Sequence, residues 1–250
     1  MPTKTILTHG GAATNPDWND GTLKAAQAGM ELLEQGQSAL TAVINAVEIL
    51  ENDTRFNAGC SSAKRADHHT IQMDAACMQS DGKYGAVACV EGIANPIFLA
   101  QYILEHSPHL LLGGEDAKRF ANANGFELAP LRSMPQKDSP PTHPHQSCDT
   151  VGAVAYDGDQ FAAALSSGGT PLASVGRIGD VPLPGCGLYC GPNGAVACTG
   201  HGESIALKVL AKQVYDWLCA GISPQLATER ALALYGADIE VGLLVLNTKD

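Results

Sequence analysis

Charged and aromatic side chains are scarce in this 250-residue chain, in which 16% of the residues are charged and 5% are aromatic. Lysine and arginine together number only 15, against 26 acidic residues, so the formal net charge is −11. A protein that neutralises nucleic-acid phosphates needs a basic patch or stripe, and this composition offers none. We therefore expect no nucleic-acid partner.

Long apolar runs are also lacking. No uninterrupted stretch approaches the ~20 apolar residues of a membrane span, and the short apolar segment after Met1 reaches His9 too early to be the core of a signal peptide. The sequence thus predicts a soluble cytoplasmic protein with no membrane partner. With 45% hydrophobic residues, the chain can bury a large core as one big domain or two small ones.

The eight cysteines have no export signal in front of them, so we expect reduced, half-buried thiols rather than disulfides. Cys186 and Cys190 form one close pair, whereas a structural zinc site usually shows two such pairs. The histidines at 68–69 and 143–145 lie in polar stretches, and we interpret them as ordinary surface residues. No catalytic metal is expected.

Hydrophobic patterning predicts a mixture of helices and strands, arranged as layers of sheet covered by helices. Ser38 and Ser223 are of a residue type that caps helix starts, and Gly125 is of a type that ends helices. The predicted strands are residues 4–8, 71–78, 85–90, 151–156, 161–166, 195–199 and 241–246, and the predicted helices are residues 20–35, 38–51, 96–106, 115–124, 203–219 and 223–234.

Residues 132–149 interrupt this pattern with four prolines, many polar residues and little apolar periodicity, which is typical of a linker. A strand that begins at Thr150 follows at once. Taken alone, Thr150 is best explained as a β-branched strand residue. A threonine that chain cleavage makes N-terminal, however, carries its own base, because its free α-amine can take the hydroxyl proton.

Ten short motifs give Thr150 a context. They are HGGA at 9–12, FNAG at 56–59, MDAA at 73–76, GAVACV at 85–90, IANPI at 93–97, DTVGAVA at 149–155, SSGG at 166–169, GRIGD at 176–180, GCG at 185–187 and TGHGE at 199–203. In this order the chain resembles the N-terminal-nucleophile hydrolases of the isoaspartyl peptidase and plant-type L-asparaginase family, which includes glycosylasparaginases and threonine aspartases. The resemblance covers nearly the whole chain.

The resemblance implies an α+β fold, a four-layer αββα sandwich. It also implies that the Thr150 hydroxyl attacks the Asp149 carbonyl, so that the chain cuts itself between these residues after water resolves the ester. The products would be an N-terminal subunit of residues 1–149, with 132–149 as its linker, and a C-terminal subunit of residues 150–250, which together form one structural domain. We expect two such cleaved pairs to associate as a dimer of heterodimers.

The resemblance also assigns roles to single positions. Thr150 corresponds to the nucleophile and Ser167 to a second hydroxyl beside it, where the family usually has threonine. Thr199 and Gly200 correspond to the oxyanion site, which a hydroxyl and a backbone N–H supply. Gly202 would contact the substrate through its main chain.

Arg177 and Asp180 would hold the two charged groups of an amino acid. The fork of a guanidinium suits an α-carboxylate, and a carboxylate suits an α-ammonium. The implied substrates are therefore isoaspartyl dipeptides and L-asparagine, with L-aspartate as the product. We interpret the neighbouring His201 as a bystander.

A loop around Asn57 resembles one that holds a structural sodium ion in the family. Its ligands would be backbone carbonyls, which any residue type can supply. They are the carbonyls of Leu50, Glu51, Asp53, Phe56, Ala58 and Cys60. No other cofactor is expected.

Two alternatives stay open. One is a threonine aspartase-like endoprotease or a glycosylasparaginase, but Asp180 argues against the protease, since a residue inside a protein chain has no free α-amine, and glycosylasparaginases are usually exported. The other is an uncleaved, non-catalytic relative that binds an amino acid. Two departures from the family keep this second alternative open, namely Ser167 in place of threonine and a chain that ends at Asp250 where the family commonly continues.

Overall fold

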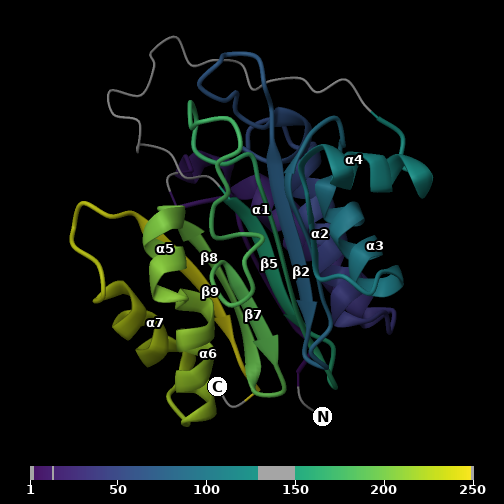
Figure 1. The fold of residues 1–250 in the computed structure, drawn as a ribbon. Helices are drawn as coiled ribbons and strands as arrows, with labels where there is room; N and C mark the ends of the chain where they lie inside the picture. The colour runs from purple at the N-terminus through teal and green to yellow at the C-terminus, as the bar shows by residue number, and fades with distance from the viewer. Residues whose placement is uncertain (1–2, 13, 129–149, 249–250) are drawn as a thin grey trace.

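Two β-sheets stacked face to face form the centre of the protein, and helices cover the outer face of each sheet (Figure 1). The structure is a computed structural model and describes residues 3–12, 14–128 and 150–248. The four layers confirm the αββα sandwich that the sequence predicted. The predicted linker 132–149, including Asp149, lies outside the described residues.

The first sheet has six strands in the order β1-β5-β6-β2-β3-β4, and all neighbours are antiparallel except β3 and β4. Strands β5 and β6, from the second half of the chain, therefore lie between β1 and β2 from the first half. The strands are β1 (Thr5–His9), β2 (Met73–Gln79), β3 (Tyr84–Val90), β4 (Leu111–Gly113), β5 (Thr150–Tyr156) and β6 (Phe161–Ser167).

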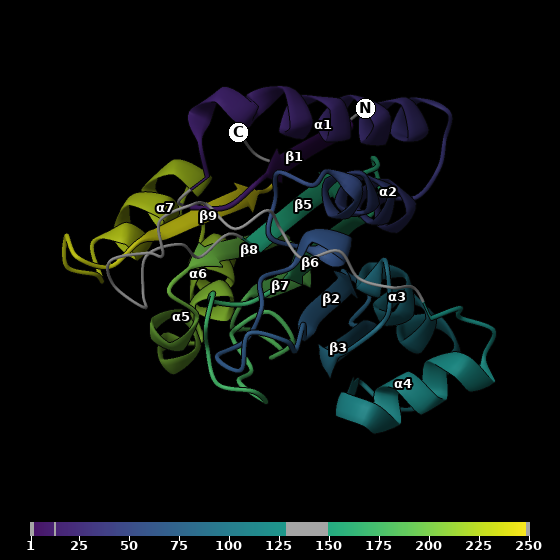
Figure 2. The same ribbon diagram turned by 90° about the horizontal axis from the view of Figure 1, so that it is seen from above.

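The second sheet has three antiparallel strands, β7 (Leu188–Gly191), β8 (Gly194–Gly200) and β9 (Val241–Leu246). Its outer face is covered by α5 (Gly202–Lys208), α6 (Leu210–Cys219) and α7 (Pro224–Leu232). Figure 2 shows the other helices on the side of the first sheet, namely α1 (Asn19–Glu34), α2 (Ala39–Asn52), α3 (Pro96–His106) and α4 (Gly114–Ala123). There are also short 3-10 helices in the described residues: η1 (Pro16–Trp18) precedes α1, and η2 (Gly59–Ser61) follows α2.

Three hydrophobic clusters fill the spaces between the four layers. Side chains alternate along each strand, so that in β5 Val151 and Ala153 pack under the helices while Val154 and Tyr156 pack between the sheets. Small residues let the layers approach closely. At Gly85 of β3, for example, a Cβ would collide with the backbone of α3.

Most predicted elements are confirmed to within two residues. The predicted N-caps are confirmed in detail, because the Ser38 hydroxyl accepts the N–H of Thr41 at 3.1 Å and the Ser223 hydroxyl accepts the N–H of Leu226 at 3.3 Å. These bonds satisfy N–H groups that the first turn of a helix leaves without a partner.

The single helix predicted over 203–219 is wrong. The chain breaks at Val209, whose φ of 49° is left-handed, and forms α5 and α6 instead. The reason is tertiary, because the carbonyls of Cys186 and Gly185 accept the N–H groups of Ala211 at 3.1 Å and Lys212 at 2.9 Å. Hydrophobic spacing continues across the break and so does not reveal it.

Two short strands, β4 and β7, were not predicted, because three or four residues are too few to show the alternation of apolar and polar residues that marks a strand. No helix within the described ranges has the length and apolar character needed to cross a membrane. The seven cysteines that the structure describes are free thiols, and Cys148 lies outside those residues.

Candidate active site

Polar side chains gather at one end of the space between the sheets. Thr150 opens β5 and pairs with Ser167, the last residue of β6, which in turn pairs with Asp74 at the start of β2. Side chains an even number of positions apart on a strand point to the same face of the sheet. Each of the three residues lies an even number of positions from a residue of its own strand that packs between the sheets, so all three face the second sheet. Antiparallel pairing thus brings together three residues that are far apart in the sequence.

The hydroxyls of Thr150 and Ser167 are in direct contact. Thr150 Oγ1 donates to Ser167 Oγ at 3.2 Å, and the backbone N–H of Gly169 donates to the same Ser167 oxygen at 3.0 Å. Both side chains are nearly inaccessible to solvent, with 5% and 6% exposure. Ser167 is thereby held by the main chain in a position that orients the hydroxyl of Thr150.

Arg177 lies on the segment that follows β6, residues 168–180, here called loop 168–180. Its Nε and Nη2 donate to the two carboxylate oxygens of Glu203 at 2.9 and 2.8 Å. These bonds lower the pKa of Glu203 to about 2, so this carboxylate is ionised at neutral pH. The guanidinium is therefore fixed in orientation along one edge, as bidentate pairs are.

Asp180 ends loop 168–180 as a buried carboxylate with 4% exposure. Burial raises its pKa to about 7; the charge of Arg177 opposes this rise, and the charges of Asp74 and Glu203 add to it. Among the described residues its Oδ2 has no hydrogen-bond partner. A buried carboxylate without full pairing is unfavourable, so Asp180 is well suited to bind a cationic group.

These residues line a common pocket. Of the residues that the sequence singled out, Thr150, Ser167, Arg177, Asp180 and Gly200 line it, and the others in its wall are Asp74, Gly169, Thr170, Gly179 and Val181.

Two further predicted site residues, Thr199 and Gly202, flank this pocket on β8 and α5. A Cβ placed on Gly202 would lie 2.7 Å from Arg177 Nη2 and 2.9 Å from Asp180 Oδ1. The glycine therefore leaves room for both charged groups. Thr199 shares the inter-sheet face of β8 with Ala195 and Ala197.

Asp74 was missed at the level of sequence, although a carboxylate within an otherwise apolar strand is a signal. It is 1% exposed, and its Oδ1 accepts the N–H of Cys89 at 2.8 Å while its Oδ2 accepts the N–H of Gly179 at 3.3 Å. Burial raises its pKa, against these hydrogen bonds and the charges of Arg65 and Arg177. Asp74 therefore connects the pocket to loop 168–180.

His9 lies on β1 beside β5, the strand that Thr150 opens, and is paired with Gly152. Burial lowers the pKa of its imidazole to about 4, so the ring is neutral at neutral pH. A Cβ on Gly152 would lie 2.5 Å from His9 Nε2, and the ring contacts the backbone of Thr150. The imidazole occupies the space that this glycine leaves.

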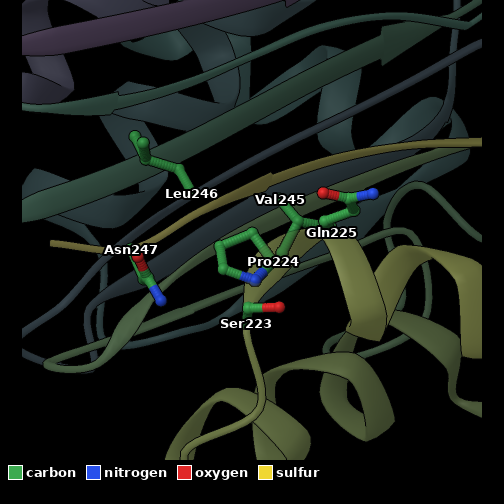
Figure 3. A pocket seen from close by; sticks show the side chains of 6 residues that line it. All are labelled: Ser223, Pro224, Gln225, Val245, Leu246 and Asn247. Atoms are coloured by element: carbon green, nitrogen blue, oxygen red, sulfur yellow. The ribbon is translucent and has the colours of Figure 1, made fainter. Parts of the chain in front are cut away.

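A roomier pocket lies elsewhere, between the start of α7 and the end of β9 (Figure 3). It has no charged side chain, and the hydroxyl of Ser223 in its wall serves as the N-cap of α7. Its other lining residues are Pro224, Gln225, Val245, Leu246 and Asn247. This wall offers neither an acid nor a base, so the pocket at Thr150 is the candidate active site.

The six carbonyls expected to hold sodium lie at and after the end of α2. The loop folds back on the helix, because the thiol of Cys60 reaches the carbonyl of Glu51 at 3.5 Å. The Glu51 side chain is fully buried and accepts from Asn95 Nδ2 at 3.0 Å and the N–H of Ile97 at 3.1 Å. In the described ranges no three His, Cys, Asp or Glu side chains group as metal ligands.

Comparison with known proteins identifies similar chains. The profile of the family described as asparaginase matches residues 3–139 and 130–249. A plant-type L-asparaginase of Pyrococcus abyssi is 35% identical over 98% of this chain and 90% of its own. Proteins named isoaspartyl peptidase/L-asparaginase are 40% identical in Bos taurus, over 82% of this chain and 73% of theirs, and 39% identical in Xenopus laevis, over 91% and 80%.

Proposed function

Because the chain belongs to the asparaginase family, we propose that it is an amidohydrolase that uses Thr150 to cleave β-aspartyl amides and release L-aspartate. One observation carries the proposal. The buried Thr150 hydroxyl, held by Ser167, shares a pocket with Arg177 and Asp180. A hydroxyl nucleophile and two opposite charges thus lie within reach of one small substrate.

The two charges suit a substrate with a free α-carboxylate and a free α-amine on the same residue. Arg177 would hold the carboxylate with the donors that Glu203 leaves available. Asp180 would hold the ammonium and so gain a partner for its buried carboxylate. L-Asparagine and isoaspartyl dipeptides carry both groups, and relatives are named for both activities.

In turnover, the Thr150 hydroxyl would attack the side-chain amide carbonyl of the substrate, and its proton would pass through the α-amine of Thr150 to the departing amine or ammonia. The backbone N–H of Gly200 and the hydroxyl of Thr199 would stabilise the oxyanion, and Gly202 would contact the substrate through its main chain. Water then hydrolyses the threonyl ester and releases L-aspartate.

This chemistry requires maturation. In the intact chain the nitrogen of Thr150 is part of a peptide bond and cannot act as a base. We therefore propose that the chain cuts itself between Asp149 and Thr150, into subunits of residues 1–149 and 150–250. We also propose that two cleaved pairs associate.

A structural sodium ion is part of the proposal. Gly59 has a φ of 54°, and a Cβ there would lie 2.8 Å from the carbonyl oxygen of Glu51 and 3.0 Å from that of Ala94. Two carbonyl oxygens thus lie beside this glycine, next to Glu51 Cβ, and carbonyl oxygens suit a hard cation. The ion would be held by the carbonyls of Leu50, Glu51, Asp53, Phe56, Ala58 and Cys60, and its charge would stabilise this loop.

The endoprotease alternative is less consistent with the pocket. A residue inside a protein chain has no α-ammonium, and Asp180 would then stay buried without a cationic partner. The binding-only alternative predicts that the chain stays whole. Both are open to direct measurement.

The first test is the intact mass and N-terminal sequence of the purified protein after incubation. Fragments of residues 1–149 and 150–250 are expected, the second starting Thr150-Val151-Gly152, together with L-aspartate release from β-aspartyl dipeptides. Thr150→Ala should abolish both the cut and turnover, while a half-buried control on β1, Thr5→Ala, should abolish neither. A Thr150→Ala chain that still splits at this bond would refute the mechanism, and a whole wild-type chain would favour the binding-only relative.

A further inference from the structure

Loop 168–180, which carries both proposed substrate-binding charges, is held by residues from the other side of the proposed cut. Its Gly176 N–H donates to the side-chain oxygen of Gln72 at 2.7 Å, and its Gly179 N–H donates to Asp74 at 3.3 Å. Main-chain bonds add to these, since Leu172 donates to Lys64 at 3.0 Å and Ala66 donates to Ala173 at 2.9 Å. The loop therefore depends on residues 64–74 for its position.

The two side-chain anchors bracket Arg177. Gly176 precedes this arginine, Gly179 follows it by two residues, and Asp180 comes next. On the same stretch, the Cys89 thiol donates to the Arg177 carbonyl at 3.4 Å, and the Cys89 N–H donates to Asp74. The backbone that sets the directions of both charged side chains is thus fixed on either side.

The buried cation of Arg65 helps the carboxylate of Asp74 to stay buried. Arg65 is a fully buried side chain with one hydrogen bond, from Nη2 to the Gln72 carbonyl at 2.9 Å. Its Nε and Nη1 have no partner among the residues that the structure describes. Nη1 faces Gly169, where a Cβ would lie 2.7 Å away. A buried cation without full pairing is unfavourable, so it needs a nearby anion.

Asp74 is the first of the anions whose charge acts on Arg65, ahead of Glu91, while the charge of Arg177 opposes them. The attraction is mutual, since the charge of Arg65 favours the ionised form of Asp74. Both oxygens of Asp74 accept hydrogen bonds, from the N–H groups of Cys89 and Gly179, and these bonds also favour the ionised form. The cation and the two anchors thus act as a unit, here called the clamp (Arg65, Gln72 and Asp74).

We propose that Asp74, balanced by the buried Arg65, is a positioning residue that, with Gln72, fixes loop 168–180 so that Arg177 and Asp180 meet the charged groups of the substrate. This inference rests on the proposed function. Among the described hydrogen bonds, none joins a side chain of the clamp to Thr150 or Ser167. The clamp therefore affects binding of the amino-acid portion and leaves the chemical step at Thr150 largely unchanged.

The test compares Asp74→Asn with the wild-type protein and with Asp116→Asn, a matched control on an exposed turn of α4. For Asp74→Asn, KM for a β-aspartyl dipeptide and the calorimetric Kd for L-aspartate should each rise about tenfold, with kcat within about threefold. Hydrogen exchange should quicken in peptides covering 168–180 and stay unchanged in α3. Asp116→Asn should match the wild type in all four measurements.

A fall in kcat at constant KM would overturn the inference, as would unchanged exchange in loop 168–180. A wild type that binds L-aspartate but hydrolyses nothing would refute the proposed function alone, because Kd and exchange still test the clamp. If Asp74→Asn does not fold, the double variant Arg65→Met/Asp74→Asn removes both buried charges, and Gln72→Ala removes the other anchor. Wild-type Kd and exchange in both of these would also overturn it.

Discussion

Replacing Asp180 with asparagine should weaken substrate binding and at the same time make stability less dependent on pH. Asp180 is buried, and its pKa is raised from 3.8 in an unfolded chain to about 7 in the folded protein. Between these values the folded state keeps a proton that the unfolded state has lost. The stability connected with this proton is present at low pH and is lost as the pH rises towards 7.

The magnitude follows from the pKa shift. Between pH 5 and pH 8, the folded state holds the extra proton over about two pH units, up to its pKa of about 7. Over this range the free energy of unfolding of the wild type falls by at most about 3 kcal/mol. The asparagine variant has no proton to lose and keeps this amount. Asparagine also leaves a buried amide, but its cost is the same at both pH values and cancels in the comparison. The buried Glu51, whose pKa is raised to about 8, contributes equally to both proteins.

Urea unfolding at pH 5 and pH 8 measures the first effect, and kcat/KM for a β-aspartyl dipeptide measures the second. We expect the loss of stability between the two pH values to be smaller in Asp180→Asn by about 1 to 3 kcal/mol. We expect kcat/KM to fall by about ten- to a hundredfold, as for a lost hydrogen bond to a charged group. Equal pH dependence in the two proteins would refute the buried carboxylate, and unchanged kcat/KM would refute its contact with the substrate ammonium.

Three further changes test other parts of the site. Ser167→Ala removes the acceptor of the Thr150 hydroxyl, so kcat should fall about tenfold or more in steady-state assays with little change in KM; an unchanged kcat would exclude the orienting role. Glu203→Gln frees the bound edge of Arg177, so KM for L-asparagine should rise about threefold to tenfold, and an equal or lower KM would contradict this. Thermal unfolding should have a higher midpoint in sodium chloride than in choline chloride at equal ionic strength, and equal midpoints would argue against the sodium site.

The local elements could be predicted where the sequence carries both a period and an end signal. Helix α3 has proline at its first position and apolar residues at helical spacing, and it was predicted with its observed bounds, Pro96–His106. The caps at Ser38 and Ser223 depend only on residues three positions away. Such features are encoded within a few residues and need no knowledge of the fold.

Features that depend on distant contacts could not be predicted in this way. Helices α5 and α6 separate at Val209 because carbonyls of residues 185–186 bind the first N–H groups of α6. The interaction of Arg65 with Asp74 cannot be predicted before the register of the sheet is known. The order of family motifs singled out Thr150 and Arg177, but no spacing in the sequence shows that both line one pocket.

The order of strands in the first sheet explains how the peptide bond before Thr150 could be cut without separating residues 1–149 from residues 150–250. Strand β5 pairs with β1 along five residue positions, and β6 pairs with β2 along six. The first part therefore supplies the neighbouring strands on both sides of the β5–β6 pair. A cut before Thr150 would leave these ladders intact, and it would free an amine at the end of a strand whose neighbours already fix its direction. The interleaving of the two halves thus permits a new chain end to form and still be held in place beside Ser167.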